Sequence, residues 1–130
     1  MPKISIAEKS MRNFMEHCNC LEDCTFYDQM VMGKLNDKLN VRISLNGGIS
    51  ADNRYGLLVE VINKEIGRID AQTYDFSKII GKIKLANGDT TTYRLWKGTG
   101  GEFEWYAGEP NATQRKKIMS YICEYLALYK

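Results

Sequence analysis

The spacing of apolar residues changes along this chain, and that change restricts the fold more than any other feature. Near both ends, apolar side chains recur every three or four residues, the period of one face of an α-helix. Between the ends they recur every second residue, the period of a half-buried β-strand. Helical ends around an alternating middle predict an α+β fold with helices packed on an antiparallel sheet.

The N-terminal helical segment is predicted from Ser5 to about Leu39, as one bent helix or a pair of short helices. Ser5 and Glu8 have the spacing of a capping box, which satisfies free backbone N–H groups at a helix start. The apolar stripe that follows is Met11, Phe14, Met15, Cys18 and Leu21. Thr25 and Asp28 repeat the capping pattern and mark the expected break. The helical period then continues through Met30, Val31, Leu35 and Leu39.

Several strands are predicted after this segment, giving a sheet of about five. The first has alternating apolar residues Val41, Ile43 and Leu45. Residues 57–62 form an apolar run rich in β-branched side chains, which is typical of a central strand. Residues 66–71 are a further candidate. The last strand is predicted from the alternation of Phe103, Trp105 and Ala107.

A β-hairpin is predicted over residues 79–96, around Asn87-Gly88. A two-residue turn there would pair Ile83 with Thr92 and mix apolar with polar side chains on each face. A three-residue loop, Ala86-Asn87-Gly88 with Gly88 in the left-handed conformation, pairs Ile83 with Thr91 instead. This register places the apolar residues on one face, and we prefer it because a one-residue slip exchanges the faces. The apolar face is then Ile79, Ile83, Leu85, Tyr93 and Leu95.

The opposite face of this hairpin is the candidate binding surface, with Lys82, Lys84, Arg94 and Trp96 as its site residues. Trp and Arg are enriched at the energetic centres of protein interfaces, so the surface suits an acidic protein. The same residues also suit a single-stranded nucleic acid, with the indole ring as a stacking platform. An ordinary solvated sheet face is the third interpretation, since edge lysines also discourage aggregation.

An amphipathic C-terminal helix is predicted to begin after Pro110, where Asn111 and Gln114 have the spacing of a helix cap. Its apolar stripe is Ile118, Tyr121, Ile122, Tyr125, Leu126 and Tyr129. We expect this stripe to pack on the sheet. If the N-terminal helices already cover that face, the stripe is instead expected to form a homodimer seam.

Composition agrees with one globular domain over residues 1–130. Hydrophobic residues make up 44% of the chain and charged residues 26%, as in average soluble domains. No run of about 18 apolar residues is present, so no membrane span is expected. The first residues lack the apolar stretch of a secretory signal, which predicts a cytoplasmic protein. A net charge of +2 does not by itself require a polyanionic partner.

The cysteines are predicted to be free thiols, because Cys18, Cys20 and Cys24 crowd together while Cys123 lies far away. On a continuous helix, His17, Cys20 and Cys24 would share one stripe and offer three soft ligands to zinc. This spacing is not the paired Cys-x-x-Cys of ordinary zinc sites, so no metal or other cofactor is expected. His17 next to Cys18 lacks an orienting third group, so no nucleophilic site is predicted.

One stretch resembles a known family of small phage-encoded anti-CRISPR proteins, which inhibit the guide-RNA-directed DNA nuclease of type II systems. The similar segments are Val41-Arg42-Ile43-Ser44, Ser50-Ala51-Asp52-Asn53-Arg54-Tyr55 and Leu57-Leu58-Val59-Glu60-Val61. This chain differs by the insertion of Asn46-Gly47-Gly48. The resemblance implies a mobile-element origin and action by binding, with a nucleic-acid-bound nuclease complex as partner.

These observations favour a small non-enzymatic binding protein, an inhibitor of a bacterial defence nuclease. Two alternatives stay open. In the first, the chain is a small-ligand pocket protein or enzyme, whose curved sheet and helices enclose a cavity lined by Trp105 and Tyr106. In the second, the chain is a single-stranded nucleic-acid-binding module that uses the same hairpin face. A steep dependence of its binding affinity on salt concentration would identify this function.

Overall fold

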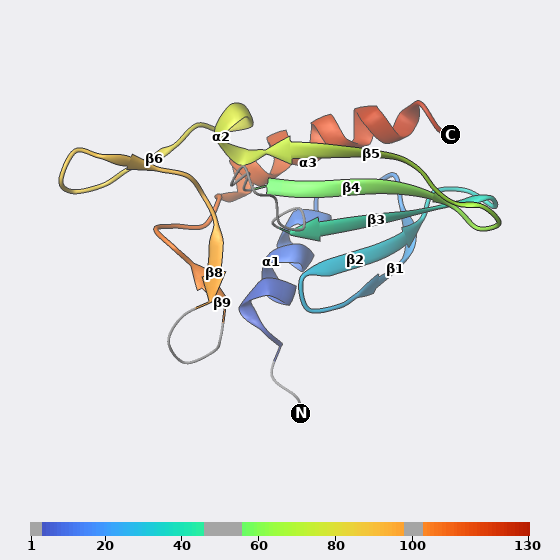
Figure 1. Ribbon diagram of the computed structural model, residues 1–130, viewed down its shortest axis with the longest axis horizontal. Helices are drawn as coiled ribbons and strands as arrows, with labels where there is room; N and C mark the ends of the chain where they lie inside the picture. The colour runs from blue at the N-terminus through green and yellow to red at the C-terminus, as the bar shows by residue number, and fades with distance from the viewer. Residues whose placement is uncertain (1–3, 46–55, 98–102) are drawn as a thin grey trace.

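The centre of the protein is a five-stranded antiparallel sheet in which strands adjacent in the chain are adjacent in space (Figure 1). The computed structural model describes residues 4–45, 56–97 and 103–130. The sheet strands are β1 (Glu22–Phe26), β2 (Met30–Lys34), β3 (Leu39–Leu45), β4 (Gly56–Asn63) and β5 (Gly67–Asp75). This meander confirms the predicted α+β class with a five-stranded antiparallel sheet.

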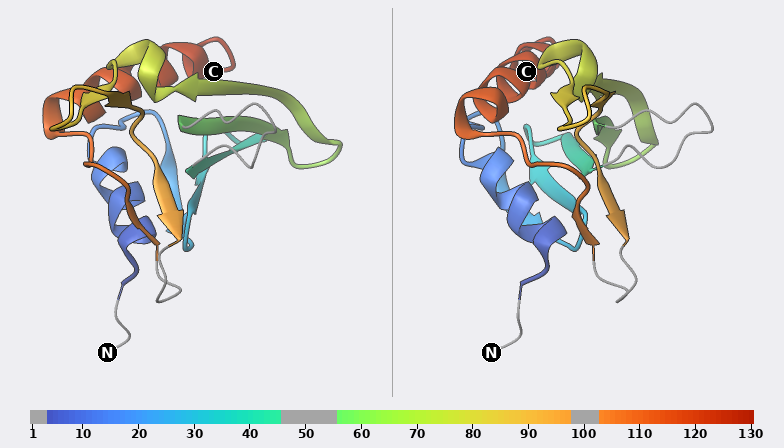
Figure 2. Two further views of the ribbon diagram at one scale, coloured as in Figure 1. Left: turned by 60° about the vertical axis from the view of Figure 1, so that its left-hand side comes forward. Right: turned by 90° about the vertical axis from the view of Figure 1, so that its left-hand side faces the viewer.

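Two long helices lie on the same side of the sheet, as the rotated views show (Figure 2). They are α1 (Ile6–Met15) and α3 (Ala112–Ala127), and a single turn, α2 (Phe76–Ile79), follows β5. Two small ladders complete the described fold: β6 (Ile83–Lys84) with β7 (Thr90–Thr91), and β8 (Leu95–Lys97) with β9 (Phe103–Trp105). Within the described ranges, no helix has the length and apolarity needed to cross a membrane.

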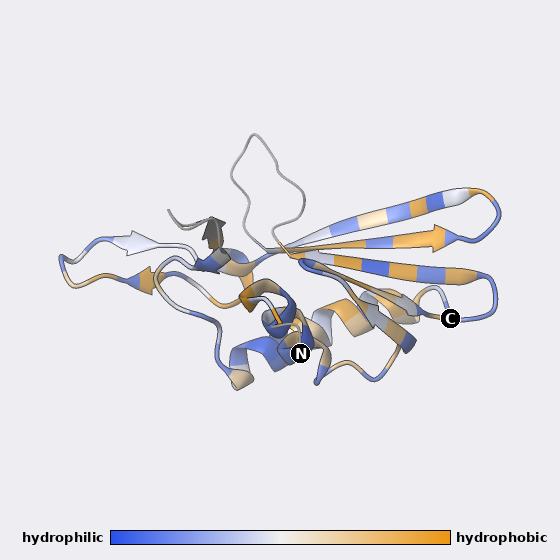
Figure 3. Cartoon of the chain, turned by 90° about the horizontal axis from the view of Figure 1, so that it is seen from below, coloured by the Kyte–Doolittle hydropathy of each residue, from blue (hydrophilic) through white to orange (hydrophobic). Residues whose placement is uncertain are grey.

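The hydrophobic core lies between the helices and the sheet face that they cover. Hydrophobic and hydrophilic bands alternate along the long strands (Figure 3), and the burial pattern of β3 alternates in the same way. The Phe14 ring of α1 stacks on Phe76 at the start of α2, with centroids 5.8 Å apart. The largest fully buried aliphatic side chains of the two long helices are Met11, Ile118, Met119, Ile122 and Leu126.

The prediction of helical structure up to Leu39 is wrong beyond α1, which ends at Met15. Residues 22–34 instead form β1 and β2, whose turn is closed by the Tyr27 amide donating to the Met30 carbonyl at 2.8 Å. Val31 and Leu35 are four residues apart, and an even spacing fits a strand as well as a helix. Pairing with β3 selects the strand, with Val31 on the buried face.

The hairpin register is confirmed, although its strands are shorter than predicted. Ile83 pairs with Thr91, and Gly88 adopts the left-handed conformation with φ 91°. Ile79, predicted to begin the first hairpin strand, instead ends α2, because the Asp75 carboxylate accepts from the Ser77 amide at 2.9 Å and caps a helical turn. At the other end, Leu95 belongs to β8 and pairs with β9, so the predicted apolar set does not share one hairpin face.

The C-terminal helix begins as predicted. The Asn111 side chain accepts from the Gln114 amide, and the Gln114 side chain accepts from the Asn111 amide, both at 2.9 Å. The stripe differs in one position: Tyr121 is 44% exposed, and Met119 is buried instead. The helix is anchored at its C-terminal end, where the Tyr129 hydroxyl donates to the Asp70 carboxylate on β5.

Candidate functional site

An arm formed by β6, β7 and their loop projects from the body of the protein (Figure 1), and of the two lysines of the predicted binding surface Lys84 lies in β6 and Lys82 immediately before it. Lys82 and Lys84 are both exposed, and Ile83 between them is half-buried. This alternation of exposure is the one expected where successive side chains point to opposite faces of an extended chain. Lys82 and Lys84 are thus both accessible next to the arm, and their role in binding stays a prediction.

Arg94 belongs to the segment that joins this arm to β8. Its guanidinium carbon lies 4.2 Å from the ring centroid of Tyr106, a cation–π geometry. Tyr106 is 46% exposed and Arg94 is half-buried, so the pair is partly accessible at the surface. Trp96 lies in β8, where its backbone is paired with Glu104. The side chain of Trp96 falls outside the described part of the structure.

Trp105 and Tyr106, the residues predicted to line a cavity, have different surroundings. The Trp105 ring packs near Phe76 with centroids 6.2 Å apart, and its Nε1 donates to Ser10 Oγ at 2.8 Å. Tyr106, by contrast, is covered on one side by Arg94. Trp105 therefore helps to hold α1 against β9, whereas Tyr106 belongs to the surface.

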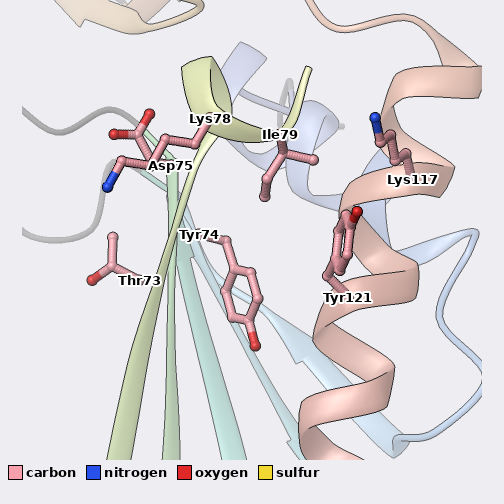
Figure 4. Close-up of a pocket in the computed structure, with 7 residues that line it drawn as sticks. All are labelled: Thr73, Tyr74, Asp75, Lys78, Ile79, Lys117 and Tyr121. Carbon is pink, nitrogen blue, oxygen red and sulfur yellow. The ribbon is translucent and has the colours of Figure 1, made fainter. Parts of the chain in front are cut away.

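A shallow hollow of about 310 Å³ lies between β5, α2 and α3 (Figure 4). Its volume is at the lower limit for small-molecule sites. Tyr121 and Lys117 face it from successive turns of α3. Burial, followed by the nearby Asp70 and Glu124 carboxylates, raises the pKa of Tyr74 to about 12. The residues that line the hollow are Thr73, Tyr74, Asp75, Lys78, Ile79, Lys117 and Tyr121.

The polar groups of this hollow do not converge on one point. Figure 4 shows Asp75 and Lys78 on one side of β5, with Tyr74, Tyr121 and Lys117 on the other. A specific ligand site needs several polar groups aimed at the same ligand atoms. The hollow is therefore a weaker candidate than the arm or the thiol group described next.

Three cysteine thiols meet where the chain leaves α1 and passes beneath α3. The Cys20 Sγ lies 3.5 Å from the Cys18 Sγ and 3.1 Å from the Cys123 Sγ. All three sulfur atoms lie within 4.8 Å of one another. Cys20 is 7% exposed, while Cys18 and Cys123 are half-buried. The three residues, defined here as the thiol group, form a compact set of soft ligand atoms at the edge of the core.

Local backbone structure explains how the thiol group forms. The amides of His17 and Cys18 donate to the Phe14 and Met15 carbonyls, so the chain closes a turn directly after α1. Hydrogen bonds from the Cys123 and Cys20 thiols to the Cys18 sulfur lower the pKa of Cys18, against the opposing effect of burial. The pKa of Cys20 is raised, because its proton is shared with the neighbouring sulfur atoms.

The metal-ligand set considered from the sequence, His17, Cys20 and Cys24, is not assembled as a stripe. That stripe required a continuous helix, and α1 ends at Met15. Cys24 lies in β1, where burial raises the pKa of its thiol, and it is not a member of the thiol group. Cys123 replaces it, although it lies 103 residues from Cys20. Sequence spacing carries no signal for a contact of that range.

His17 lies beside the thiol group instead of within it. Together with Cys123 it lines a second hollow, of about 430 Å³, between the turn after α1 and the exposed side of α3. The His17 Nε2 atom is buried and has no hydrogen-bond partner among the described residues. All four cysteines are free thiols in this structure.

No protein-family model, no curated protein and no solved structure matches this chain.

Proposed function

We propose that this chain is a small non-enzymatic binding protein that engages an acidic surface of a partner protein through the arm of β6 and β7. The observation that carries the proposal is the placement of Lys82 and Lys84. Both are exposed at a projecting two-stranded arm, while Ile83 between them is half-buried and lies next to Gly108. A narrow arm with exposed cations can enter a groove and pair with carboxylates there.

The Arg94–Tyr106 pair supports a protein partner at the base of the arm. Arg and Tyr are enriched at the centres of protein interfaces, where a flat guanidinium over an aromatic ring loses little conformational entropy on binding. We also propose Trp96, whose backbone lies in β8, as an aromatic anchor of this contact. A single-stranded nucleic acid remains the competing partner, because the same residue types bind phosphates and stack on bases.

The resemblance of residues 41–61 to an anti-CRISPR family suggests which partner to test first. We propose a cytoplasmic inhibitor whose partner is a nucleic-acid-bound nuclease of bacterial defence. A basic arm would contact acidic residues of such a nuclease, which lie outside the basic surfaces that hold nucleic-acid phosphates. A homodimer that presents two arms is compatible with this proposal.

The test is capture of partners from a bacterial lysate by the immobilised chain, with and without nuclease treatment, followed by affinity measurement. The variant K82E/K84E is expected to slow association by at least about tenfold, because surface charges steer the encounter. Trp96→Ala is expected to weaken binding by about 2 kcal/mol, as loss of an aromatic anchor does. Both variants should keep the melting temperature of the parent.

The matched control is K38E/K64E. These two exposed lysines lie next to each other at the turns β2–β3 and β4–β5, where the Lys64 amide donates to the Lys38 carbonyl at 3.1 Å. These turns are at the end of the sheet away from the arm (Figure 1). The control changes the net charge equally and should bind like the parent. Binding by K82E/K84E that equals binding by the parent chain would contradict the proposal. A steep loss of the parent's affinity as the salt concentration rises would indicate a nucleic-acid partner instead.

A further inference from the structure

We propose that Cys18, Cys20 and Cys123 form a binding site for a zinc ion, with His17 as the fourth ligand. This site is separate from the proposed binding arm. It rests on the three-dimensional arrangement of the thiol group, which the spacing of cysteines along the chain does not reveal. A Cys₃His set is one of the ordinary ligand sets of structural zinc.

The distances between the sulfur atoms are close to those that zinc requires. Tetrahedral zinc with Zn–S bonds of about 2.3 Å places its sulfur ligands about 3.8 Å apart. The Cys20 Sγ lies 3.5 Å from the Cys18 Sγ and 3.1 Å from the Cys123 Sγ. The sulfur atoms therefore need to separate by less than about 1 Å to admit the ion between them.

The chemistry of the three ligands selects the kind of ion. Thiolates are soft ligands that prefer zinc and copper(I) to magnesium or calcium. Among the described residues, no carboxylate belongs to the thiol group. Binding replaces the thiol protons, which pass to the solvent, and joins three sulfur atoms that otherwise only share hydrogen bonds. Zinc satisfies this ligand set without any redox step.

His17 is the proposed fourth ligand, and its ring has to turn toward the sulfur atoms, because neither ring nitrogen lies within 4.8 Å of all three. His17 immediately precedes Cys18 in the turn after α1, and it lines the same hollow as Cys123. Its Nε2 atom is buried without a hydrogen-bond partner among the described residues, which is costly for a polar nitrogen. A metal ion at the edge of the hollow would give this atom a partner.

The proposed ion would connect two parts of the fold that are distant in the sequence. Cys18 and Cys20 belong to the turn after α1, whereas Cys123 belongs to α3. An ion that binds only the folded chain stabilises it in proportion to its affinity. Zinc would therefore clamp the two long helices together on their side of the sheet.

The test uses the full chain, reduced, stripped of metal with a chelator and kept without oxygen. Titration with Co²⁺, a spectroscopic substitute for zinc, should saturate at one ion per chain, with thiolate charge-transfer absorption and the visible bands of a tetrahedral site. Added Zn²⁺ should abolish these bands and raise the melting temperature. Failure of the parent chain to bind either ion would overturn the proposal.

Variants then assign the ligands. Cys123→Ser and Cys18→Ser, at half-buried positions, are expected to weaken binding on the order of 100-fold or more, because loss of a ligand exceeds the usual effect of its supporting groups. Cys24→Ser is the matched control and should bind like the parent, since it lies outside the thiol group. Circular dichroism without metal verifies that each variant is folded.

Two further outcomes decide against parts of the proposal. Unchanged affinity and an unchanged cobalt spectrum in His17→Asn would show that His17 is not the fourth ligand. Binding that persists equally in Cys123→Ser and Cys18→Ser would show that the ion lies elsewhere. Rapid formation of a Cys20–Cys123 disulfide in air, together with no metal binding when reduced, would identify the group as a redox pair instead.

Discussion

Arg42 and Glu60 face each other across β3 and β4, and their side chains form a two-pronged ion pair. The Arg42 Nε and Nη2 atoms donate to the two carboxylate oxygens at 2.7 and 2.9 Å. Arg68 on β5 donates to the same carboxylate at 3.2 Å. These hydrogen bonds allow Glu60 to be only 5% exposed, because both of its oxygens are paired. The pair fixes the middle of the sheet on the face away from the helices.

The first prediction concerns the dependence of this ion pair on pH. Hydrogen bonding from Arg42, opposed by burial and assisted by Arg68, lowers the pKa of Glu60 from its ordinary 4.5. Glu60→Gln should therefore lower the free energy of unfolding by about 2 kcal/mol at neutral pH, a modest value because the Arg42 side chain is 38% exposed. The measurement is urea unfolding at pH 7.

The sign of the pH effect follows from the lowered pKa. The ionised carboxylate stabilises the folded state fully above about pH 4.5, and this contribution disappears as the pH falls through the lower folded pKa. The difference between parent and Glu60→Gln should therefore shrink in acid. Glu65→Gln in the exposed β4–β5 turn serves as control and should match the parent throughout. A difference that stays constant down to acid pH would contradict the role of this ion pair.

The second prediction concerns Gly56, where β4 begins beside β5. A Cβ atom at this position would lie 1.9 Å from the Tyr74 carbonyl oxygen, so the two strands would have to separate. Gly56→Ala should cost about 2–3 kcal/mol of folding free energy, because it overpacks a rigid backbone contact. Gly108→Ala is the matched control, since its nearest neighbour, the Ile83 Cδ1, would be 3.6 Å away. Equal melting temperatures for the two variants would refute the close approach.

The third prediction concerns the tyrosines of α3. The Tyr125 ring lies edge-on to Tyr129 with centroids 5.7 Å apart, and its centroid is 6.3 Å from that of Tyr74. Tyr125→Ala should destabilise the fold by about 3 kcal/mol, because a large aromatic group is removed from between α3 and β5. Tyr121→Ala on the same helix should cost less than about 1 kcal/mol, since that ring is largely exposed. Thermal unfolding of both variants tests the contrast, and a Tyr125→Ala protein as stable as the parent would rule it out.

The fourth prediction concerns the buried hydroxyl of Ser10. Its Oγ accepts from the Trp105 indole at 2.8 Å and donates to the Glu109 carboxylate at 3.2 Å, which ties α1 to β9 and to the segment after it. Ser10→Ala should cost about 1–2 kcal/mol, because the indole N–H loses its acceptor in a partly buried place. Ser120→Ala, at an exposed position of α3, is the control and should be close to neutral. Chemical unfolding measures the free energy of unfolding of both variants. A Ser10→Ala protein as stable as the parent would mean that water readily replaces the hydroxyl.

Short-range patterns in the sequence were sufficient for several elements. The capping of α3 by Asn111 and Gln114 involves residues three positions apart, and the structure contains both hydrogen bonds. The pairing of Ile83 with Thr91 follows from the loop that joins the two strands. These features depend on backbone conformation over a few residues, and so the nearby residue types determine them.

Other features were decided only by the tertiary structure. Residues 30–34 have apolar spacing that fits both a helix and a strand, and the backbone hydrogen bonds offered by β3 select the strand. The contact between Cys20 and Cys123 exists because the end of α1 meets α3, which no local pattern encodes. Local sequence patterns determine the conformation of a few neighbouring residues, whereas packing depends on the energy of the whole arrangement of the chain. The helix cap and the hairpin register therefore follow from the sequence alone, while the thiol group and the β1–β2 hairpin follow from which surfaces the folded chain brings into contact.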